Sequence, residues 1–415
     1  MNRDQLELLK SKYDFKSDVL DIIIGGKSSL DASNPFEMKD LAEANRFILS
    51  YGYDLENPIE QAEILGNFHE AIHFIRKMFL QPENPTGLKL EIPRKILEIT
   101  HIQELFLMVS KTHPSQKTDQ NDKLLHDWSC SILKVMHTIA HIDKDLRSAY
   151  FSDIQKQIFD RFYKLVHRDS EGCLYLGESP SDPLRIPLVA FETKPKKSRE
   201  STILKLLHKP ENVAEDIFDR VGIRFITETP LAALRVVKYL KDQMVVIPPN
   251  IKPSRSRNTL IPVEPLKQKL EELFRQSDPE NLQETHLENA LSQLTQKPEL
   301  NPANPHSSEH YRAIQFTCRQ LIKLKNPLYE DLKELKGISR DKTLQDNVLR
   351  ILDRIDFKNI QRDIRFFYPY EVQVMDQQSA EENEKGKSSH AAYKKAQVQT
   401  ALQRVMGNLA HASRG

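Results

Sequence analysis

The sequence predicts an α+β protein in which an all-helical N-terminal domain precedes a mixed β-sheet flanked by helices. Apolar residues recur at helical three- and four-residue spacing over residues 1–175. Short apolar strand candidates alternate with helices over residues 185–400. The chain of 415 residues also exceeds the size at which one hydrophobic core usually stops growing. We therefore expect two domains, with residues 401–415 forming the end of the last helix and a tail.

The N-terminal domain is expected to be a succession of helices. Asn57 and Pro58 are typical of an N-cap and a first helical position, and they open a helix that runs to about Leu80. Stretches rich in proline and lysine separate the others. Further helices are predicted at residues 37–50, 92–111, 121–144 and 152–167.

Strands are expected from the start of the second domain. The apolar run at 185–192 and the segment 222–227 are strand candidates. Thr229 and Pro230 begin a helix, and residues 244–247 return as a strand. These segments predict a strand–helix–strand unit.

An insertion is expected in the middle of the second domain, because residues 262–305 are polar and mainly helical. A strand at 313–318 and a helix near 342–355 should follow it, and a final helix should begin at residues 388–389.

The strand predicted at residues 370–375 alternates cleanly. Its period of two directs Val372 and Val374 toward the core, so Glu371 and Gln373 share the opposite face.

Composition excludes several classes of protein. Hydrophobic residues make up 39% and charged residues 29%, which is typical of a soluble chain. The apolar runs are too short for a bilayer, and the N-terminus is too polar for a signal peptide, so we expect a cytoplasmic protein with no membrane partner. The net charge of +1 gives no global field to attract duplex DNA.

Two segments, residues 197–205 and residues 219–224, carry side chains suited to binding nucleotide phosphates or their metal ion. Lys197, Ser201 and Lys205 would share one face of a helix, and lysine is a compact charge suited to phosphate oxygens. Asp219 precedes the strand that carries Arg224, and its carboxylate is the hard oxygen ligand that Mg²⁺ prefers.

Two later segments carry further candidate binding residues. Tyr311 supplies an aromatic plane suited to stacking on a base. Glu371 and Gln373 lie together on the strand described above, and His390 and Tyr393 stand at the start of the final helix.

In this order the four segments resemble the synthetase domain of the RelA/SpoT family of alarmone synthetases, over roughly half of the chain. The resemblance implies a nucleotidyltransferase-type fold. It also implies an enzyme of the stringent response that needs Mg²⁺ and transfers pyrophosphate from ATP to the 3′-hydroxyl of GDP or GTP.

The resemblance implies a role for each candidate residue. Asp219 and Glu371 would be catalytic and would hold Mg²⁺. The residues implied to bind the ATP phosphates are Lys197, Ser201, Lys205 and Arg224. Those implied or suggested to bind the acceptor are Tyr311, Lys252, Arg255, Gln373 and His390.

Four positions depart from the family pattern. Pro195 and Met375 stand where the family has arginine, His310 replaces a glycine, and Gln315 replaces a histidine. The departures leave two alternatives open: a catalytically inactive nucleotide sensor, and a pyrophosphotransferase with another acceptor such as tRNA.

Hydrolase chemistry is the competing interpretation for the N-terminal half. His69, Glu70 and His73 have the H-E-x-x-H spacing of a zinc hydrolase. Other residues invite comparison with the HD-type phosphohydrolase domain of long family members, although the required distant aspartate is not identified. These residues are His101, His126, Asp127, His137, His141 and Asp143.

Overall fold

The structure, a computed structural model, is α+β, which confirms the predicted fold class. It describes residues 22, 24, 28–31, 38, 40–110, 119–179, 181–194, 198–209, 220–276, 285–286, 289, 311–338, 354–355, 360–385 and 390–412.

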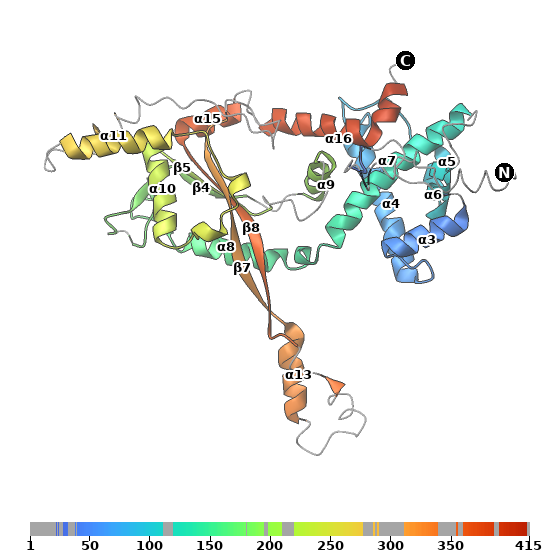
Figure 1. Ribbon diagram of the computed structural model, residues 1–415, viewed down its shortest axis with the longest axis horizontal. Helices are drawn as coiled ribbons and strands as arrows, with labels where there is room; N and C mark the ends of the chain where they lie inside the picture. The colour runs from blue at the N-terminus through green and yellow to red at the C-terminus, as the bar shows by residue number, and fades with distance from the viewer. Residues whose placement is uncertain are drawn as a thin grey trace, which may run out of the picture. The chain divides into compact units, whose positions relative to one another are not determined.

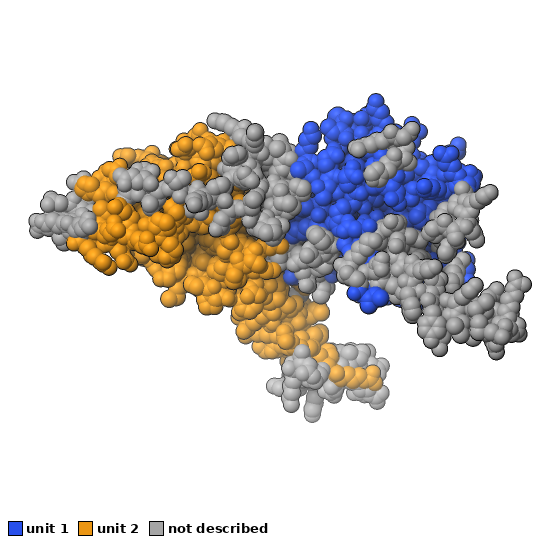
Figure 2. Space-filling model, turned by 45° about the horizontal axis from the view of Figure 1, so that its top comes forward, with its two compact units in different colours: residues 1–148, 197–217, 389–415 blue, residues 149–196, 218–388 orange. Residues whose placement is uncertain are grey.

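The chain divides into two compact units (Figure 2). Unit 1 comprises residues 1–148, 197–217 and 389–415, and unit 2 comprises residues 149–196 and 218–388. This division differs from the predicted one, in which the first domain ends near residue 175. Packing is the reason, because α9 (Arg199–Leu207) and α16 (His390–Ala412) bury apolar side chains in the core of unit 1.

Unit 1 is a set of helices around one apolar core. Trp128 of α7 (Gln120–Asp143) and Phe68 of α4 (Pro58–Phe79) are among its fully buried side chains. The cap predicted for α4 is confirmed, since the Asn57 side chain accepts a hydrogen bond from the Ile59 amide. The shorter helices are α3 (Leu41–Tyr51), α5 (Arg94–Leu97), α6 (Gln103–Ser110) and the 3₁₀ turn η1 (Leu146–Ser148).

The helix predicted at 92–111 is interrupted between α5 and α6. Ile99 and Ile102 lie in the interruption and are still buried in the core. The helical spacing of apolar residues therefore continues through a segment whose backbone is not helical.

Polar side chains of α7 meet α16 where that helix kinks at Met406. The Ser131 hydroxyl donates to the Val405 carbonyl at 3.0 Å, and the Lys134 ammonium donates to the Arg404 carbonyl at 3.2 Å. A kink opens the ladder of helical hydrogen bonds, and these side chains supply donors at that point.

Unit 2 begins with α8 (Phe151–Tyr163) and a small antiparallel sheet in the order β1-β2-β3. Its strands are β1 (Val166–Arg168), β2 (Leu174–Leu176) and β3 (Ile186–Leu188). The helix predicted at 152–167 therefore ends at Tyr163. Strands of three residues are too short to show a period of two, which is why the sequence did not reveal β1 and β2.

A mixed five-stranded sheet in the order β4-β5-β8-β7-β6 forms the centre of unit 2. β5 and β8 are parallel, and the other neighbours are antiparallel. The long strands β7 and β8 extend beyond the others as a ribbon that leads to α13 (Figure 1). The bounds are β4 (Ala190–Thr193), β5 (Gly222–Thr227), β6 (Arg257–Asn258), β7 (Ile314–Lys325), β8 (Asp363–Asp376) and α13 (Pro327–Ile338).

The two faces of this sheet differ in character. Val372 and Val374 are fully buried on one face, where α8 and α10 (Pro230–Asp242) pack, which confirms the predicted alternation. The opposite face carries Glu371 and Gln373. At one end of that face, Ala380 of α15 (Gln377–Lys385) packs against Met375.

The prediction of a strand at residues 244–247 is wrong. Met244 has a left-handed backbone (φ 53°), and the amides of Val245 and Val246 donate to the Leu240 carbonyl at 2.9 and 3.0 Å. The segment thus closes the C-terminus of α10 and does not enter a sheet. The parallel partner of β5 is β8, far along the chain.

Other boundaries also differ. The strand predicted at 185–192 is two strands, β3 and β4, in different sheets. Helix α11 (Val263–Gln276) starts the insertion between β6 and β7, as predicted, and most of residues 277–305 and of the helix predicted near 342–355 lies outside the described residues. Within the described chain, no helix has the length and apolarity needed to span a bilayer.

Candidate functional site

A row of polar side chains crosses the face of the five-stranded sheet that lies opposite Val372 and Val374. Register places Glu192 beside Arg224, Arg224 beside Gln373, Gln373 beside Gln315, and Gln315 beside Arg257. Directly paired residues of neighbouring strands point to the same side of a sheet. Every strand therefore contributes one polar side chain to this row.

Glu371 lies one step along the same face and is the centre of a hydrogen-bond network. Its Oε1 accepts from the Lys194 ammonium at 2.7 Å and from the Gln373 amide at 2.9 Å. Its Oε2 accepts from the Gln315 amide at 2.6 Å. The side chain is only 10% exposed, so a buried carboxylate is compensated here by one cation and two amides.

Arg224 extends this network toward the β4 edge. Its Nε donates to the Gln373 Oε1 at 3.3 Å, and its Nη1 donates to the Glu192 carboxylate at 3.2 Å. The guanidinium is thus held on the polar face, beside the glutamate network.

A glycine allows Lys194 to reach Glu371. A Cβ at Gly222 would overlap the Lys194 Cδ, far inside van der Waals contact. The aliphatic part of Lys194 therefore lies over the backbone of Gly222, whose register partner is Glu371. The close approach is the reason that this strand begins with glycine.

Tyr311 borders the polar face next to a small apolar cluster. Its ring packs against the cluster that contains Met375 and Ala313, so it is half-buried. Burial raises the pKa of Tyr311 to about 12, while the nearby charges of Arg224 and Arg257 lower it and that of Glu371 raises it. The tyrosine is thus in electrostatic reach of the residues around Glu371.

Met375 stands where the RelA/SpoT pattern has an arginine, and its surroundings are apolar. Met375 is 1% exposed and belongs to the apolar cluster beneath Tyr311. An arginine at this position would have to place its charge among apolar side chains, and the cluster leaves it without a role.

Cations also line the β7 edge. The Lys252 amide donates to the carbonyl of Thr317, the residue paired with Glu371 across β7 and β8. Arg255 ends the 3₁₀ turn η4 (Pro253–Arg255), which leads into β6. The predicted acceptor cations therefore flank the strand that carries Gln315.

The predicted site residues fall into both units. Ser201 and Lys205 lie on α9 of unit 1, one helical turn apart, whereas Arg224, Lys252, Tyr311 and Glu371 belong to unit 2. Several of the predicted residues lie outside the part of the chain that the structure describes. They are Pro195, Lys197, Asp219 and His310, together with the side chains of His390 and Tyr393.

The described residues fit Mg²⁺ only by donor type. Glu371 offers the carboxylate oxygens that the ion prefers, and Mg²⁺ is commonly held by one or two carboxylates together with substrate phosphates. Both oxygens of Glu371 already accept hydrogen bonds. Oε1 accepts two of these bonds and Oε2 accepts one, so among the described contacts one lone pair of Oε2 remains for an ion. Among the described residues, no three acidic, histidine or cysteine side chains form a metal-binding group.

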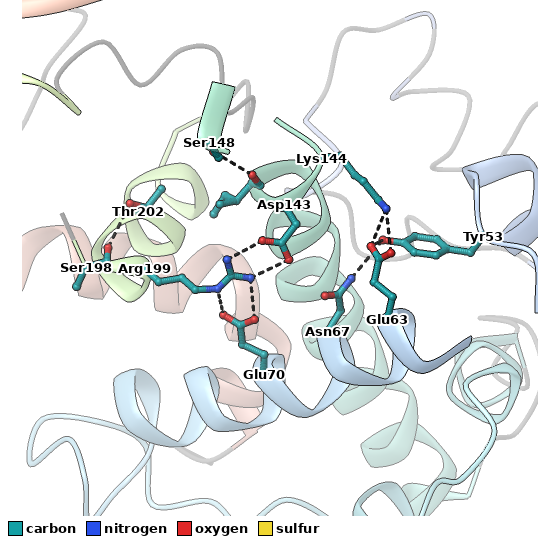
Figure 3. Close-up of polar contacts among 11 residues, drawn as sticks. Tyr53, Glu63, Asn67, Glu70, Asp143, Lys144, Ser148, Ser198, Arg199 and Thr202 are labelled. Carbon is teal, nitrogen blue, oxygen red and sulfur yellow. Dashed lines mark hydrogen bonds and ion pairs between the residues drawn. The ribbon is translucent and has the colours of Figure 1, made fainter. Parts of the chain in front are cut away.

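The zinc-hydrolase motif on α4 is engaged differently from a metal site. Glu70 forms two hydrogen bonds with Arg199, which also bonds both carboxylate oxygens of Asp143 at 2.6 and 2.8 Å (Figure 3). These bonds raise the pKa of Arg199 well above its ordinary value. His69 and His73 are exposed. Glu70 therefore serves an ion-pair cluster that joins α4, α7 and α9.

The histidines considered for an HD-type site are also dispersed. His126 Nδ1 lies 3.1 Å from the Asp127 carboxylate, and both side chains are buried in the core of unit 1. His137 Nδ1 lies 2.7 Å from the Tyr51 hydroxyl, and its ring contacts that of His141. His101 is exposed. These contacts are those of structural residues.

Sequence reasoning missed the contribution of Lys194 and Gln315. Both contact Glu371 directly, yet Lys194 stands in a run with Lys196 and Lys197 that does not distinguish it, and Gln315 departs from the RelA/SpoT pattern. The glycine at 222 was the available signal, because it marks a strand position approached closely by another group.

Comparison of the chain with models of known protein families, with curated proteins and with solved structures finds no match.

Proposed function

We propose that unit 2 is a nucleotide-binding transferase domain of the RelA/SpoT synthetase type, which transfers pyrophosphate from ATP to the 3′-hydroxyl of GDP or GTP. The observation that carries the proposal is the network around Glu371. A carboxylate is held by two amides and a lysine on a sheet face that also carries Arg224 and Arg257.

The charges of this face suit a transfer between polyphosphates. Phosphoryl-transfer enzymes act mainly by positioning the reactants and neutralising charge, with little covalent chemistry of their own. Lys194 and Arg224 would contact donor phosphates from one side of Glu371. Lys252 or Arg255 would contact acceptor phosphates from the other side, together with Gln373.

In the proposed reaction, the acceptor 3′-hydroxyl attacks the β-phosphorus of ATP. The bond between the β-phosphorus and the oxygen of the α-phosphate breaks, and AMP leaves with that oxygen. Glu371 accepts the proton of the attacking hydroxyl, while Gln315 and Gln373 hold its carboxylate in place. Tyr311 would stack on the acceptor base. Mg²⁺, held by Glu371 and Asp219, would neutralise charge on the donor phosphates.

The same network also favours the sensor as a second candidate. Lys194 forms a 2.7 Å ion pair with Glu371, and the amides of Gln315 and Gln373 donate to the same carboxylate. If the pair persists with nucleotide bound, the domain would bind nucleotide without transferring pyrophosphate.

The test is an assay of the purified full chain with Mg²⁺, ATP labelled on the γ-phosphate, and GDP, GTP or tRNA as separate acceptors. We expect label to move to GDP or GTP with release of AMP. The Glu371→Gln variant, which keeps the side-chain shape but cannot accept the proton, should lose at least about 100-fold in rate. Glu330→Gln on the exposed surface of α13 is the matched control and should keep the rate.

Nucleotide binding by equilibrium dialysis distinguishes the alternatives. Binding of ATP and guanine nucleotide without AMP release would favour the sensor. Transfer to tRNA, independent of guanine nucleotide, would favour the changed acceptor. Undiminished turnover in Glu371→Gln would contradict the assigned role of this residue.

A further inference from the structure

The ribbon formed by residues 319–325 of β7 and 363–369 of β8 has one covered face and one open face. Ile322 and Leu324 on the covered face are buried in the core of unit 2. Gln157 of α8 fixes the same strand, since its side chain bonds both the carbonyl (2.9 Å) and the amide (3.2 Å) of Lys323. The ribbon is thus a supported extension of the sheet, and it leads to α13 (Figure 1).

The open face exposes an apolar pair at its centre. Leu321 and Phe367 are direct cross-strand partners, and they are 50% and 52% exposed. Exposed aromatic and aliphatic side chains on the face of a β-ribbon are unfavourable in a free monomer, so such a pair marks a binding surface when other features agree.

Basic residues surround this pair on the same face. Lys323 lies directly opposite Arg365, although like charges at paired positions destabilise a sheet. Asp363 lies 3.2 Å from the Lys323 ammonium and 3.3 Å from the Arg365 guanidinium. With Arg319 and Lys325 the open face has four cations and one carboxylate, a net charge of +3, whereas the whole chain has +1.

The chemistry of the face selects the class of ligand. Residues two apart on a strand are spaced by about 6.6 Å, and a line of cations on one face of the strand complements a phosphate backbone. An exposed phenylalanine needs a flat partner, which an unpaired base provides and a stacked duplex does not. We infer that the open face of the β7–β8 ribbon binds single-stranded nucleic acid.

The experiment measures fluorescence anisotropy of labelled single-stranded RNA and DNA oligonucleotides of the same sequence, with the purified full chain. Two ribbon variants are compared with wild type: Phe367→Ala, and the double variant Lys323→Gln with Arg365→Gln. The control is Lys267→Gln with Lys269→Gln on α11, which removes two exposed cations elsewhere in unit 2.

We expect the single strand to bind, and Phe367→Ala to weaken binding at least about five-fold, the smallest effect typical of one lost stack. The double variant should weaken binding and lower the slope of log affinity against log salt by about 1.4, since each phosphate contact contributes about 0.7 for single strands. The control should match wild type. Equal affinity for RNA and DNA would support contacts to bases and phosphates, and tighter binding of RNA would support an added contact to the 2′-hydroxyl.

Three results would overturn the inference: no binding at low salt, equal loss of affinity in the α11 control, or a duplex of the same sequence bound as tightly as the single strand. Circular dichroism of each variant would show that the fold is retained. Nucleotide pyrophosphotransfer by the ribbon variants should equal that of wild type, so failure of this inference and failure of the proposed function give different results.

Discussion

At the scale of single residues, the site depends on one close contact between a side chain and the backbone. Lys194 reaches Glu371 only because Gly222 has no side chain. The position of Lys194 therefore has two consequences. It supplies the cation beside the Glu371 carboxylate, and it requires a residue without a side chain at position 222, the first residue of β5. A polar network of this kind can be weakened by substitutions that do not remove any of its polar groups.

We expect Gly222→Ala to displace Lys194 and break its ion pair with Glu371. The displaced atoms belong to a flexible side chain, so the strand should remain and the free energy of unfolding should fall by roughly 1–3 kcal/mol, the cost of leaving a buried charge without one partner. Urea denaturation of wild type and Gly222→Ala measures this change in the free energy of unfolding. Gly66→Ala is the control, because a Cβ at this position of α4 meets nothing within 4 Å and should stabilise by roughly 0.5–1 kcal/mol.

Two serines of α7 should respond differently to the same substitution. The Ser131 hydroxyl bonds the carbonyls of Asp127 and Val405 at 2.8 and 3.0 Å. Ser129 Oγ is buried and has no hydrogen-bond partner among the described residues. Thermal or urea unfolding should show Ser131→Ala destabilised by roughly 1–2 kcal/mol and Ser129→Ala unchanged or more stable. If the free energy of unfolding fell equally in both variants, the hydrogen bond from the Ser131 hydroxyl to the Val405 carbonyl would contribute nothing to stability.

At the scale of elements, helices α3 and α7 meet through a contact that responds to pH. The Tyr51 hydroxyl of α3 lies 2.7 Å from Nδ1 of His137 on α7. Burial lowers the pKa of His137 to about 4, with the nearby His141 lowering it further. The imidazole is therefore neutral in the folded protein under conditions in which an unfolded chain would protonate it.

This shift predicts that acid weakens the contact. Between pH about 4 and 6.5 the unfolded chain binds a proton at His137 and the folded protein does not, so the free energy of unfolding rises with pH across that window. The gain from pH 4.5 to 7 should be roughly 2 kcal/mol. To isolate the contribution of His137, the free energy of unfolding in urea is measured for wild type and for His137→Gln at both pH values, and the two changes with pH are compared. An identical pH dependence in the two proteins would contradict it.

At the scale of the whole molecule, the chain enters and leaves each unit more than once. Unit 1 takes its core from three separate stretches, the last of which begins at residue 389. Its described core residues come from residues 30–142, 203–207 and 401–410. The residues that connect the two units are correspondingly distributed along the sequence and do not form one linker.

Removal of residues 389–415 should consequently unfold unit 1 and spare unit 2. The truncation removes buried Leu402, Val405, Met406 and Leu409 from the core of unit 1, each of which contributes roughly 1.5–3 kcal/mol when fully buried. Their sum is comparable to the whole stability of a typical domain. Hydrogen exchange should show amides of α7 losing protection while those of β5 and β8 keep theirs. Retained protection in α7 would contradict this assignment of α16.

Much of the fold could be predicted from local patterns. Asn57 and Pro58 located the start of α4, and Thr229 located that of α10, because capping depends on neighbouring backbone groups. The alternation at 371–374 correctly assigned the two faces of β8. In contrast, residues 244–247 have the composition of a strand and close a helix, since their partner is the carbonyl of Leu240 and not another strand.

The sequence by itself determined the α+β class, the helices of α4 and α7, and the side of β8 on which Glu371 lies, because each of these follows from the spacing of apolar residues along a short segment. Only the tertiary structure decided that β5 pairs with β8, that Lys194 and Gln315 bond Glu371, and that α9 and α16 complete the helical core. These arrangements join residues far apart in the chain, and which distant segments meet depends on the complementary packing of whole surfaces, which no local pattern records.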